Sequence, residues 1–400
     1  MHSGRNPGYI PRVYLNGNNN PTITHVDLQD RNLHGPTGGR EVVGLLKKRP
    51  SVTAITLNQN ELGDDGLSIV LQYLTYNSTS LGITTLSLNC CNLGDSSLEG
   101  LGEYIRNHRT LQNLSLQNNT FKGDPHIVTH FTQCLNSSSI SKLDLGRNPQ
   151  AGDTFVVTML SHLNASQLDH LNLAAMNLTP ASQEAILSYL SSPASRPLRF
   201  FGCGGNRLTR PFADALIHGL WTGNYWLKYV ELHGNLLNSM SLPEETRPEA
   251  CPSSPADSAE ARMKPWPACQ KDMDYALHRN RLAGDFAGDG AVRLLPCARV
   301  VVQQLGAGNA HAALPFELKA LILNELAPSL SLKQCHRIVH YAAQGFRNAA
   351  KTRQSFLKAV QCDVFEPNSL DDVLRALNNI NTGRLTLVHG TGLPSLATFG

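Results

Sequence analysis

Apolar and polar residues alternate in a short phrase that recurs eight times along the first part of the chain. The phrase reads Leu-x-x-Leu-x-Leu-x-x-(Asn/Cys)-x-Leu, with other aliphatic residues at some leucine positions, and its clearest copy is VTAITLNQNEL, from Val52 to Leu62. Period-two alternation predicts a short strand in each copy, with Ile55 and Leu57 facing inward and Thr56 facing outward. The other copies recur about every 29 residues and begin at Ile23, Ile83, Leu111, Ile140, Leu168, Leu198 and Leu227.

An asparagine or a cysteine follows the strand in most copies. Its side chain is expected to satisfy backbone groups left open where the strand ends, so that stacked copies form a buried ladder. Cys91 replaces the asparagine in the third copy and Cys203 takes an inward leucine position, so both thiols are expected to be free and buried. The ladder asparagines expected to be buried are Asn60, Asn119, Asn148, Asn206 and Asn235.

The second half of each repeat has helical spacing. After a turn, apolar residues recur on one helix face, as in Leu98, Leu101 and Ile105. Each repeat is therefore predicted to be a strand followed by a helix, and the stack an α/β horseshoe with a parallel sheet inside and helices outside. In three repeats an acidic residue stands where a helix N-terminus favours an oxygen acceptor: Asp64, Asp95 and Asp153.

The wording of these repeats resembles a known class. The stretches LNQNELGDDGL at 57–67 and LNCCNLGDSSL at 88–98 resemble leucine-rich repeats of the ribonuclease-inhibitor class, which includes array domains of NOD-like receptors and Ran GTPase activators. The resemblance covers residues 23–237 and implies the horseshoe fold. It implies no single function, because unrelated activities share this scaffold.

Composition changes along the chain and predicts five segments. An N-terminal cap is expected over residues 1–22, followed by an array of eight repeats over 23–237. A Pro/Ser-rich linker without apolar periodicity is expected over 238–271. A helical region over 272–363 and a C-terminal tail over 364–400 complete the chain, with LHRNRL at 277–282 interpreted as helical and not as a ninth repeat.

A second resemblance lies in the helical region. The segment at 314–341 begins LPFELKALILNEL and resembles the opening helix of an F-box, which docks on a Skp1-type adaptor in ubiquitin ligases. It departs from that pattern because it follows the array and lacks the aromatic-basic ending, so a structural helical cap remains the alternative. The positions that the resemblance assigns to adaptor binding are Leu314, Pro315, Leu318 and Ile322.

Composition narrows the class of protein. The chain has 41% hydrophobic and 16% charged residues and a net charge of +3, which favours neither nucleic acid nor a membrane as partner. The N-terminus lacks an apolar signal region, and no apolar run approaches the roughly 18 residues of a membrane helix. Nine cysteines without a CxxC pair indicate no disulfide framework. A cytoplasmic or nuclear protein is therefore expected.

No catalytic, cofactor or metal site is predicted. His336 and His340 are four residues apart beside Cys335, but the metalloprotease pattern also needs a glutamate between the histidines. The glycine runs at 202–206 and 284–290 lack the GK[ST] ending of a phosphate loop. The protein is therefore not expected to be an enzyme.

The open face of the sheet is the predicted binding site. Large and charged side chains point outward only in repeats five to eight, where Gly202 and Gly204 are expected to leave open space between aromatic rings. This composition is typical of protein-binding hot spots, although Phe200 and Tyr229 could instead pack under the linker. The residues predicted to bind the partner are Lys142, Asp144, Arg147, His170, Phe200, Tyr229, Glu231 and His233.

These patterns favour a protein-protein interaction scaffold whose partner is a protein of unknown identity. The alternative is an F-box-type substrate receptor of a ubiquitin ligase, in which the box binds a Skp1-type adaptor and the array selects the client. A GTPase-activating repeat protein like the Ran activators is disfavoured, because those carry a strongly acidic tail and this chain ends in the neutral LTLVHGTGLPSLATFG.

Overall fold

The computed structural model describes residues 24–78, 81–238, 265–304, 315–327, 330–343 and 352–364. The expected N-terminal cap, most of the linker, Leu314 and the tail beyond 364 lie outside the described residues. The chain divides into two compact units, residues 1–270 and 271–400.

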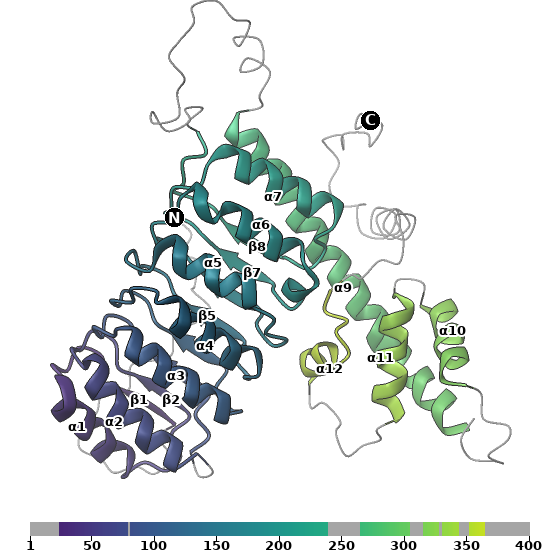
Figure 1. Cartoon of the computed structure of the whole chain (residues 1–400). Coiled ribbons are helices and arrows are strands. Elements are labelled where there is room, and N and C mark those ends of the chain that lie inside the picture. Colours follow the sequence, from purple (N-terminus) through teal and green to yellow (C-terminus); the bar gives the residue numbers. More distant parts are fainter. Residues whose placement is uncertain are drawn as a thin grey trace, which may run out of the picture. The chain divides into compact units, whose positions relative to one another are not determined.

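The first unit is built on one parallel sheet of eight strands in chain order (Figure 1). Neighbouring strands pair in a constant register, so that Val26, Ile55 and Leu86 occupy equivalent places. The strands are β1 (His25–Asp27), β2 (Ala54–Thr56), β3 (Thr85–Ser87), β4 (Asn113–Ser115), β5 (Lys142–Asp144), β6 (His170–Asn172), β7 (Phe200–Gly202) and β8 (Tyr229–Glu231).

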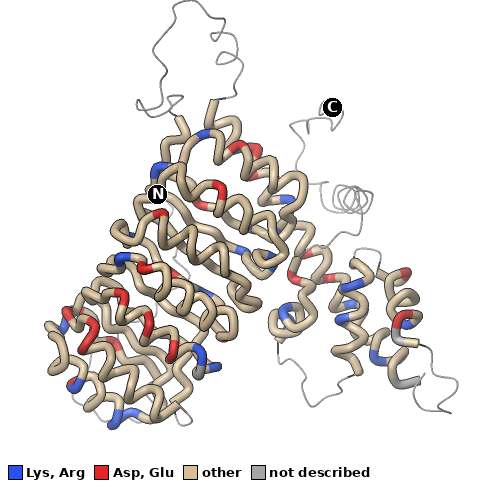
Figure 2. The backbone as a smooth tube through the Cα atoms, viewed as in Figure 1, with Lys and Arg blue, Asp and Glu red and all other residues tan. Residues whose placement is uncertain are grey.

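A helix follows each of the first seven strands, and these helices lie side by side in a layer over the sheet (Figure 1). Acidic residues mark the outer helices of the early repeats (Figure 2), as expected for a face in contact with water. The predicted α/β horseshoe architecture is confirmed. The helices are α1 (Gly35–Leu46), α2 (Gly63–Tyr76), α3 (Asp95–Asn107), α4 (Pro125–Asn136), α5 (Gly152–His162), α6 (Gln183–Ser191) and α7 (Arg210–Thr222), with short 3-10 helices at Pro180–Ser182 and Pro193–Ser195.

The core lies between the sheet and the helix layer. The middle residue of nearly every strand is buried while its neighbours are more exposed, as the alternation predicts. Leu116, Phe131 and Phe155 are fully buried in this core.

The asparagine ladder also forms. The Asn119 carbonyl oxygen accepts hydrogen bonds from the N–H groups of Cys91 and Leu93, at 3.0 and 3.2 Å. Its amide nitrogen donates to the carbonyls of Leu88 and Leu116, at 3.0 and 2.9 Å. One side chain therefore ties together backbone groups of two repeats. Asn60, Asn148 and Asn206 are buried in equivalent places, and Asn235 is half-buried.

After the first repeat, two ladder positions hold a residue other than asparagine. The Cys91 thiol donates to the Leu57 carbonyl at 3.1 Å and so keeps one link between the second and third repeats. Met176 occupies the ladder position of the sixth repeat, where it is fully buried but has no hydrogen to donate. Within the residues that the structure describes, the ladder therefore makes no side-chain bond between the fifth and sixth repeats.

The three acidic residues have a different role from the one expected. Asp64, Asp95 and Asp153 make no capping bond to their own helices. Each accepts hydrogen bonds from the following repeat: Asp95 binds the N–H groups of Lys122 and Asp124, at 2.9 and 3.0 Å. The expectation of helix caps was wrong because the three aspartates lie within the first helical turn, while the N-cap positions are held by Leu62, Gly94 and Ala151. They act instead as a second set of links between repeats.

The remaining described helices are α9 (Trp266–Gln304), α10 (Phe316–Leu326), α11 (Leu332–Ala343) and α12 (Arg353–Ala359). The LHRNRL stretch lies within α9, so its interpretation as helix is confirmed. In the second unit, alanines of α9 pack against Leu323, Ile338 and Phe356 in a separate core. Among the described residues, no helix is both long and apolar enough to cross a membrane.

Helix α9 begins inside the segment interpreted as a linker. Pro267 suits the first turn of a helix, where its missing N–H costs nothing. In the first unit, the Arg210 guanidinium of α7 lies 5.8 Å from the Trp266 ring and donates to Cys269 Sγ at 2.6 Å. Arg210 also pairs with Asp214 at 2.8 Å. The first turn of α9 therefore covers part of the last helix of the array.

Candidate functional site

The candidate site lies on the open face of the sheet, opposite the helices. Register places Lys142, His170, Phe200 and Tyr229 in one row across β5 to β8. A second row holds Asp144, Asn172, Gly202 and Glu231. We use the name late sheet face for the two rows together with Arg147 and His233, which follow β5 and β8. All eight predicted binding residues belong to it.

Aromatic rings form the centre of the late sheet face. The His170 and Phe200 rings stack with centroids 3.9 Å apart and planes tilted by only 4°. Burial lowers the pKa of His170, which therefore favours its neutral form. Tyr229 comes next in the row and has 54% of its surface exposed. The row thus offers an ordered pair of rings beside an accessible one.

Charged groups surround these rings. Lys142, Arg147, Glu231 and His233 are exposed. Asp144 is half-buried and accepts hydrogen bonds from the side chains of Asn172 (3.1 Å) and Gln117 and from the Gly146 N–H (3.0 Å). Asp144 is therefore held in place by its neighbours, whereas the exposed charges are free to turn toward a partner.

The open space expected at two glycines is absent. A Cβ atom on Gly202 would lie 2.6 Å from Asn172 Oδ1, and one on Gly204 would lie 2.9 Å from the His233 carbonyl oxygen. Both glycines are buried. The expectation was wrong because side chains from adjacent positions fill the volume that the missing side chains leave.

The early repeats present a contrasting surface. Their outward polar groups bond to one another: the Ser87 hydroxyl donates to Asn58 Oδ1 and the Ser115 hydroxyl to Asn89 Oδ1, both at 2.8 Å. Groups already paired in this way gain little from a partner. The late sheet face is therefore the stronger candidate.

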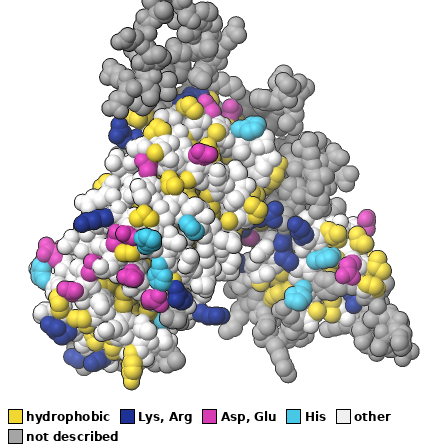
Figure 3. All heavy atoms as spheres, viewed as in Figure 1, with side chains coloured by type: hydrophobic (Ala, Val, Ile, Leu, Met, Phe, Trp, Pro, Cys, Tyr) yellow, Lys and Arg dark blue, Asp and Glu magenta, His cyan; other side chains and the backbone are white. Residues whose placement is uncertain are grey.

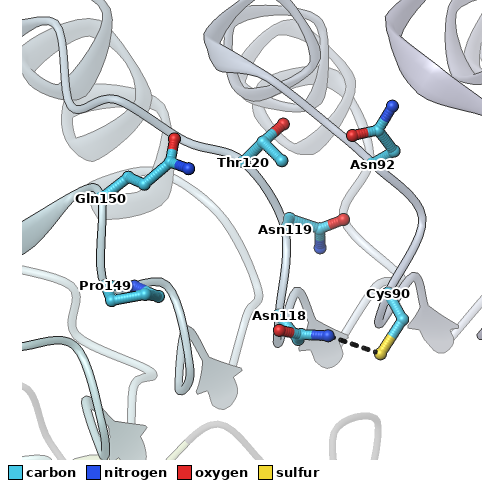
Figure 4. Close-up of a pocket in the computed structure, with 7 residues that line it drawn as sticks. All are labelled: Cys90, Asn92, Asn118, Asn119, Thr120, Pro149 and Gln150. Carbon is cyan, nitrogen blue, oxygen red and sulfur yellow. Dashed lines mark hydrogen bonds between the residues drawn. The ribbon is translucent and has the colours of Figure 1, made fainter.

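A pocket of about 370 Å³ opens at the turns after β3, β4 and β5 (Figure 4). Asn118 donates from its side-chain nitrogen to Cys90 Sγ at 3.2 Å across its floor. The lining residues carry no charged side chain, so acid-base chemistry has no obvious group there. They are Cys90, Asn92, Asn118, Asn119, Thr120, Pro149 and Gln150.

The helix layer holds a cluster that the sequence analysis missed. Glu103 of α3 lies beside His130 and Cys134 of α4. Only the four-residue spacing of His130 and Cys134 is visible in the sequence. Glu103 lies a full repeat earlier, so its approach depends on how α3 and α4 stack.

Two of the four predicted adaptor-binding residues, Leu318 and Ile322, lie on α10. Pro315 immediately precedes the helix, and Leu318 and Ile322 are 43% and 44% exposed. Leu321 and Leu326 are exposed as well. We call Leu318, Leu321, Ile322 and Leu326 the α10 stripe.

Comparisons with known proteins agree with the repeat geometry. No family model matches the chain. Ribonuclease inhibitor from Sus scrofa is 29% identical over 202 residues, which cover 42% of this chain and 42% of that protein. The chain thus spans less than half the length of the curated relative it matches. An internalin from Listeria monocytogenes is 14% identical, with 55% of this chain and 83% of that chain covered and a TM-score of 0.18.

The repeated phrase, the parallel sheet with its outer helices and the asparagine ladder define the class of protein. The array therefore has the leucine-rich repeat fold, and over 202 residues its sequence is similar to that of a ribonuclease inhibitor.

Proposed function

We propose that the chain is a protein-interaction scaffold that binds a partner protein on the late sheet face and catalyses no reaction. The observation that carries this proposal is the row Lys142, His170, Phe200 and Tyr229, which puts an exposed aromatic ring beside a fixed stack and a free cation.

The side chains of this row have properties that favour binding to another protein. Aromatic side chains contribute large contact areas at protein interfaces and dominate their hot spots. The His170–Phe200 stack is already ordered, so binding costs it little side-chain entropy. Lys142 and Glu231 carry opposite charges on either side of the rings, which favours a partner surface of mixed charge over a polyanion. The Sus scrofa relative is by name an inhibitor of a ribonuclease, itself a protein.

Tyr229→Ala tests the proposal. A partner captured with the full chain is expected to bind this variant more weakly by about 2 kcal/mol or more, the usual threshold for a hot spot. Thermal stability should change little, because half of the side chain is exposed. The matched control is Tyr76→Ala, since Tyr76 is 90% exposed on α2 and far along the chain from the site. Calorimetry measures affinity, and a melting curve measures stability.

Either of two other results would contradict binding on the late sheet face. If Tyr229→Ala lowers the melting temperature and leaves affinity intact, Tyr229 packs under residues 238–271. If Tyr76→Ala weakens binding as much as Tyr229→Ala, the partner uses the helix layer.

The α10 stripe favours a second candidate, an F-box-type substrate receptor of a ubiquitin ligase. Four exposed apolar side chains on one short helix suit burial against an adaptor. Purified Skp1-type adaptor should bind the full chain, and Leu318→Glu or Ile322→Glu should abolish that binding. Val300→Glu is the control, because Val300 is an exposed apolar residue on α9. Equal binding by all three variants contradicts an adaptor role for α10.

We propose the cytoplasm or the nucleus as the location. Eight cysteines among the described residues are free thiols, and most are buried. Thiols persist in reducing compartments.

A further inference from the structure

Three side chains capable of binding a metal meet on the helix layer. Glu103 lies on α3, and His130 and Cys134 lie one turn apart on α4. His130 Nε2 is 2.9 Å from a Glu103 carboxylate oxygen and 3.7 Å from Cys134 Sγ. The three candidate ligand atoms all lie within 4.8 Å of one another. Figure 3 shows histidine and acidic side chains gathered on this face, over the early repeats.

We propose that Glu103, His130 and Cys134 bind a Zn²⁺ ion that joins the third repeat to the fourth. Sulfur, imidazole nitrogen and carboxylate oxygen are the ligands that zinc takes in proteins, whereas calcium and magnesium prefer oxygen alone. Three protein ligands leave the fourth tetrahedral position for a water molecule.

The two separations that involve His130 are close to this coordination. Zinc bonds of about 2.0–2.3 Å in tetrahedral geometry place ligand atoms roughly 3.3–3.8 Å apart. The separation of His130 Nε2 from Cys134 Sγ, 3.7 Å, already falls in that range. The separation of His130 Nε2 from the Glu103 oxygen, 2.9 Å, must widen by about half an ångström, which a small rotation of the exposed Glu103 side chain provides.

Packing leaves an approach for the ion. Cys134 is buried, while the side chains of His130 and Glu103 are 31% and 51% exposed. Gly102 lies against the cluster: a Cβ atom there would sit 3.5 Å from both Cys134 Sγ and His130 Cδ2. The site therefore has one buried ligand, the Cys134 thiol, and two partly exposed ligands.

Charge favours an ion here as well. A Zn²⁺ ion bound by the Cys134 thiolate and the Glu103 carboxylate is neutral as a group, so the charges of the two ligands are balanced. Arg106 competes for Glu103, since its guanidinium lies 3.6 Å from that carboxylate, but it is 45% exposed and can turn toward water.

Titration of the reduced full chain with Co²⁺ tests the site, because cobalt bound to a thiolate absorbs in the near ultraviolet. One equivalent should bind with this band, and Zn²⁺ should displace it. Cys134→Ser should abolish the band, and His130→Gln and Glu103→Gln should weaken binding by about tenfold or more. Arg106→Gln should tighten binding. Cys90→Ser and His218→Gln are matched controls outside the cluster and should bind as the unmodified chain does.

Circular dichroism shows whether Cys134→Ser folds. If it does not, cobalt binding by His130→Gln tests the site, because the His130 side chain is partly exposed and its loss leaves no cavity in the core. The proposal is overturned if the unmodified chain shows no thiolate band with one equivalent of Co²⁺. It is equally overturned if His130→Gln binds cobalt as tightly as His218→Gln.

Discussion

A single ladder asparagine holds backbone groups of two repeats at once, and its loss leaves them buried without partners. Asn119→Ala is expected to lower the free energy of unfolding by about 1–3 kcal/mol, because unpaired buried groups pay their full desolvation cost. Chemical denaturation measures the change. Gln133→Ala on the exposed face of α4 serves as control and should stay within about 0.5 kcal/mol of the unmodified chain. A loss no larger than that of the control would contradict the role of Asn119.

His170 makes stability depend on pH. Burial lowers its folded-state pKa, with Asp144 opposing and Lys142 reinforcing the shift. The unfolded chain, with a histidine pKa of about 6.5, therefore binds more protons than the folded chain in mildly acidic solution. The stabilising contribution is complete above about pH 6.5 and is lost as pH falls through the folded pKa.

The corresponding variant is His170→Gln. It is expected to lose less stability than the unmodified chain between about pH 7 and pH 5, as measured by urea denaturation at several pH values. His108 contributes to the same window, because burial also lowers its pKa. His108→Gln should therefore flatten the same pH dependence, and an unchanged slope in His170→Gln would show that the stacked imidazole does not control it.

The sequence predicted which residues face outward from the sheet, but it did not predict which neighbouring side chains surround them. Strand alternation alone identifies Lys142, His170 and Tyr229 as outward, and the register agrees. The same reasoning failed at Gly202, where Asn172 of the neighbouring strand fills the space. Alternation describes one strand at a time, whereas packing depends on the neighbouring repeats.

At the scale of elements, two helices touch through glycines. A Cβ atom on Gly66 of α2 would lie 2.5 Å from the Gly35 carbonyl oxygen at the start of α1. Gly66→Ala is therefore expected to lower the free energy of unfolding by about 1–3 kcal/mol, the usual cost of overpacking. Gly44 of α1 has open space around it, so Gly44→Ala should raise stability by about 0.5–1 kcal/mol through helix propensity.

Denaturation of the two variants measures the difference. Alanine is expected to stabilise the helix equally in both variants. The two variants therefore differ in whether the new Cβ atom has room. If Gly66→Ala is as stable as Gly44→Ala, then α1 and α2 can separate without cost, and their close approach is not what positions the first repeats.

The sequence predicted which segments form strands and helices more reliably than it predicted the side-chain contacts between them. Period-two phrases gave the strands, helical spacing gave the helices, and both are present. The roles of Asp95 and Glu103 could not be predicted, because each acts on a partner one repeat away. The start of α9 at Trp266 was missed for a similar reason, since its contacts with Arg210 come from a distant part of the chain.

At the scale of the whole molecule, composition indicated where repeats give way to unrelated helices. The array ends and a second core of α9 to α12 begins with no repeated phrase. The partner could not be inferred in the same way. The exposed side chains show which chemical groups are available for binding. They do not identify the partner, because many proteins present a complementary surface.

Met176 leaves the border between the fifth and sixth repeats without a ladder bond, but other bonds cross that border. Asp153 accepts hydrogen bonds from the Thr179 N–H at 2.8 Å and from the Thr179 hydroxyl at 2.6 Å, and Asp144 accepts one from Asn172 at 3.1 Å. Because each repeat in such a stack contacts only its neighbours, these carboxylates hold together the two repeats that the ladder leaves unconnected. The proposed binding face crosses the same border, with Lys142 on one side and Phe200 and Tyr229 on the other, so a partner bound there would add contacts between the same two repeats.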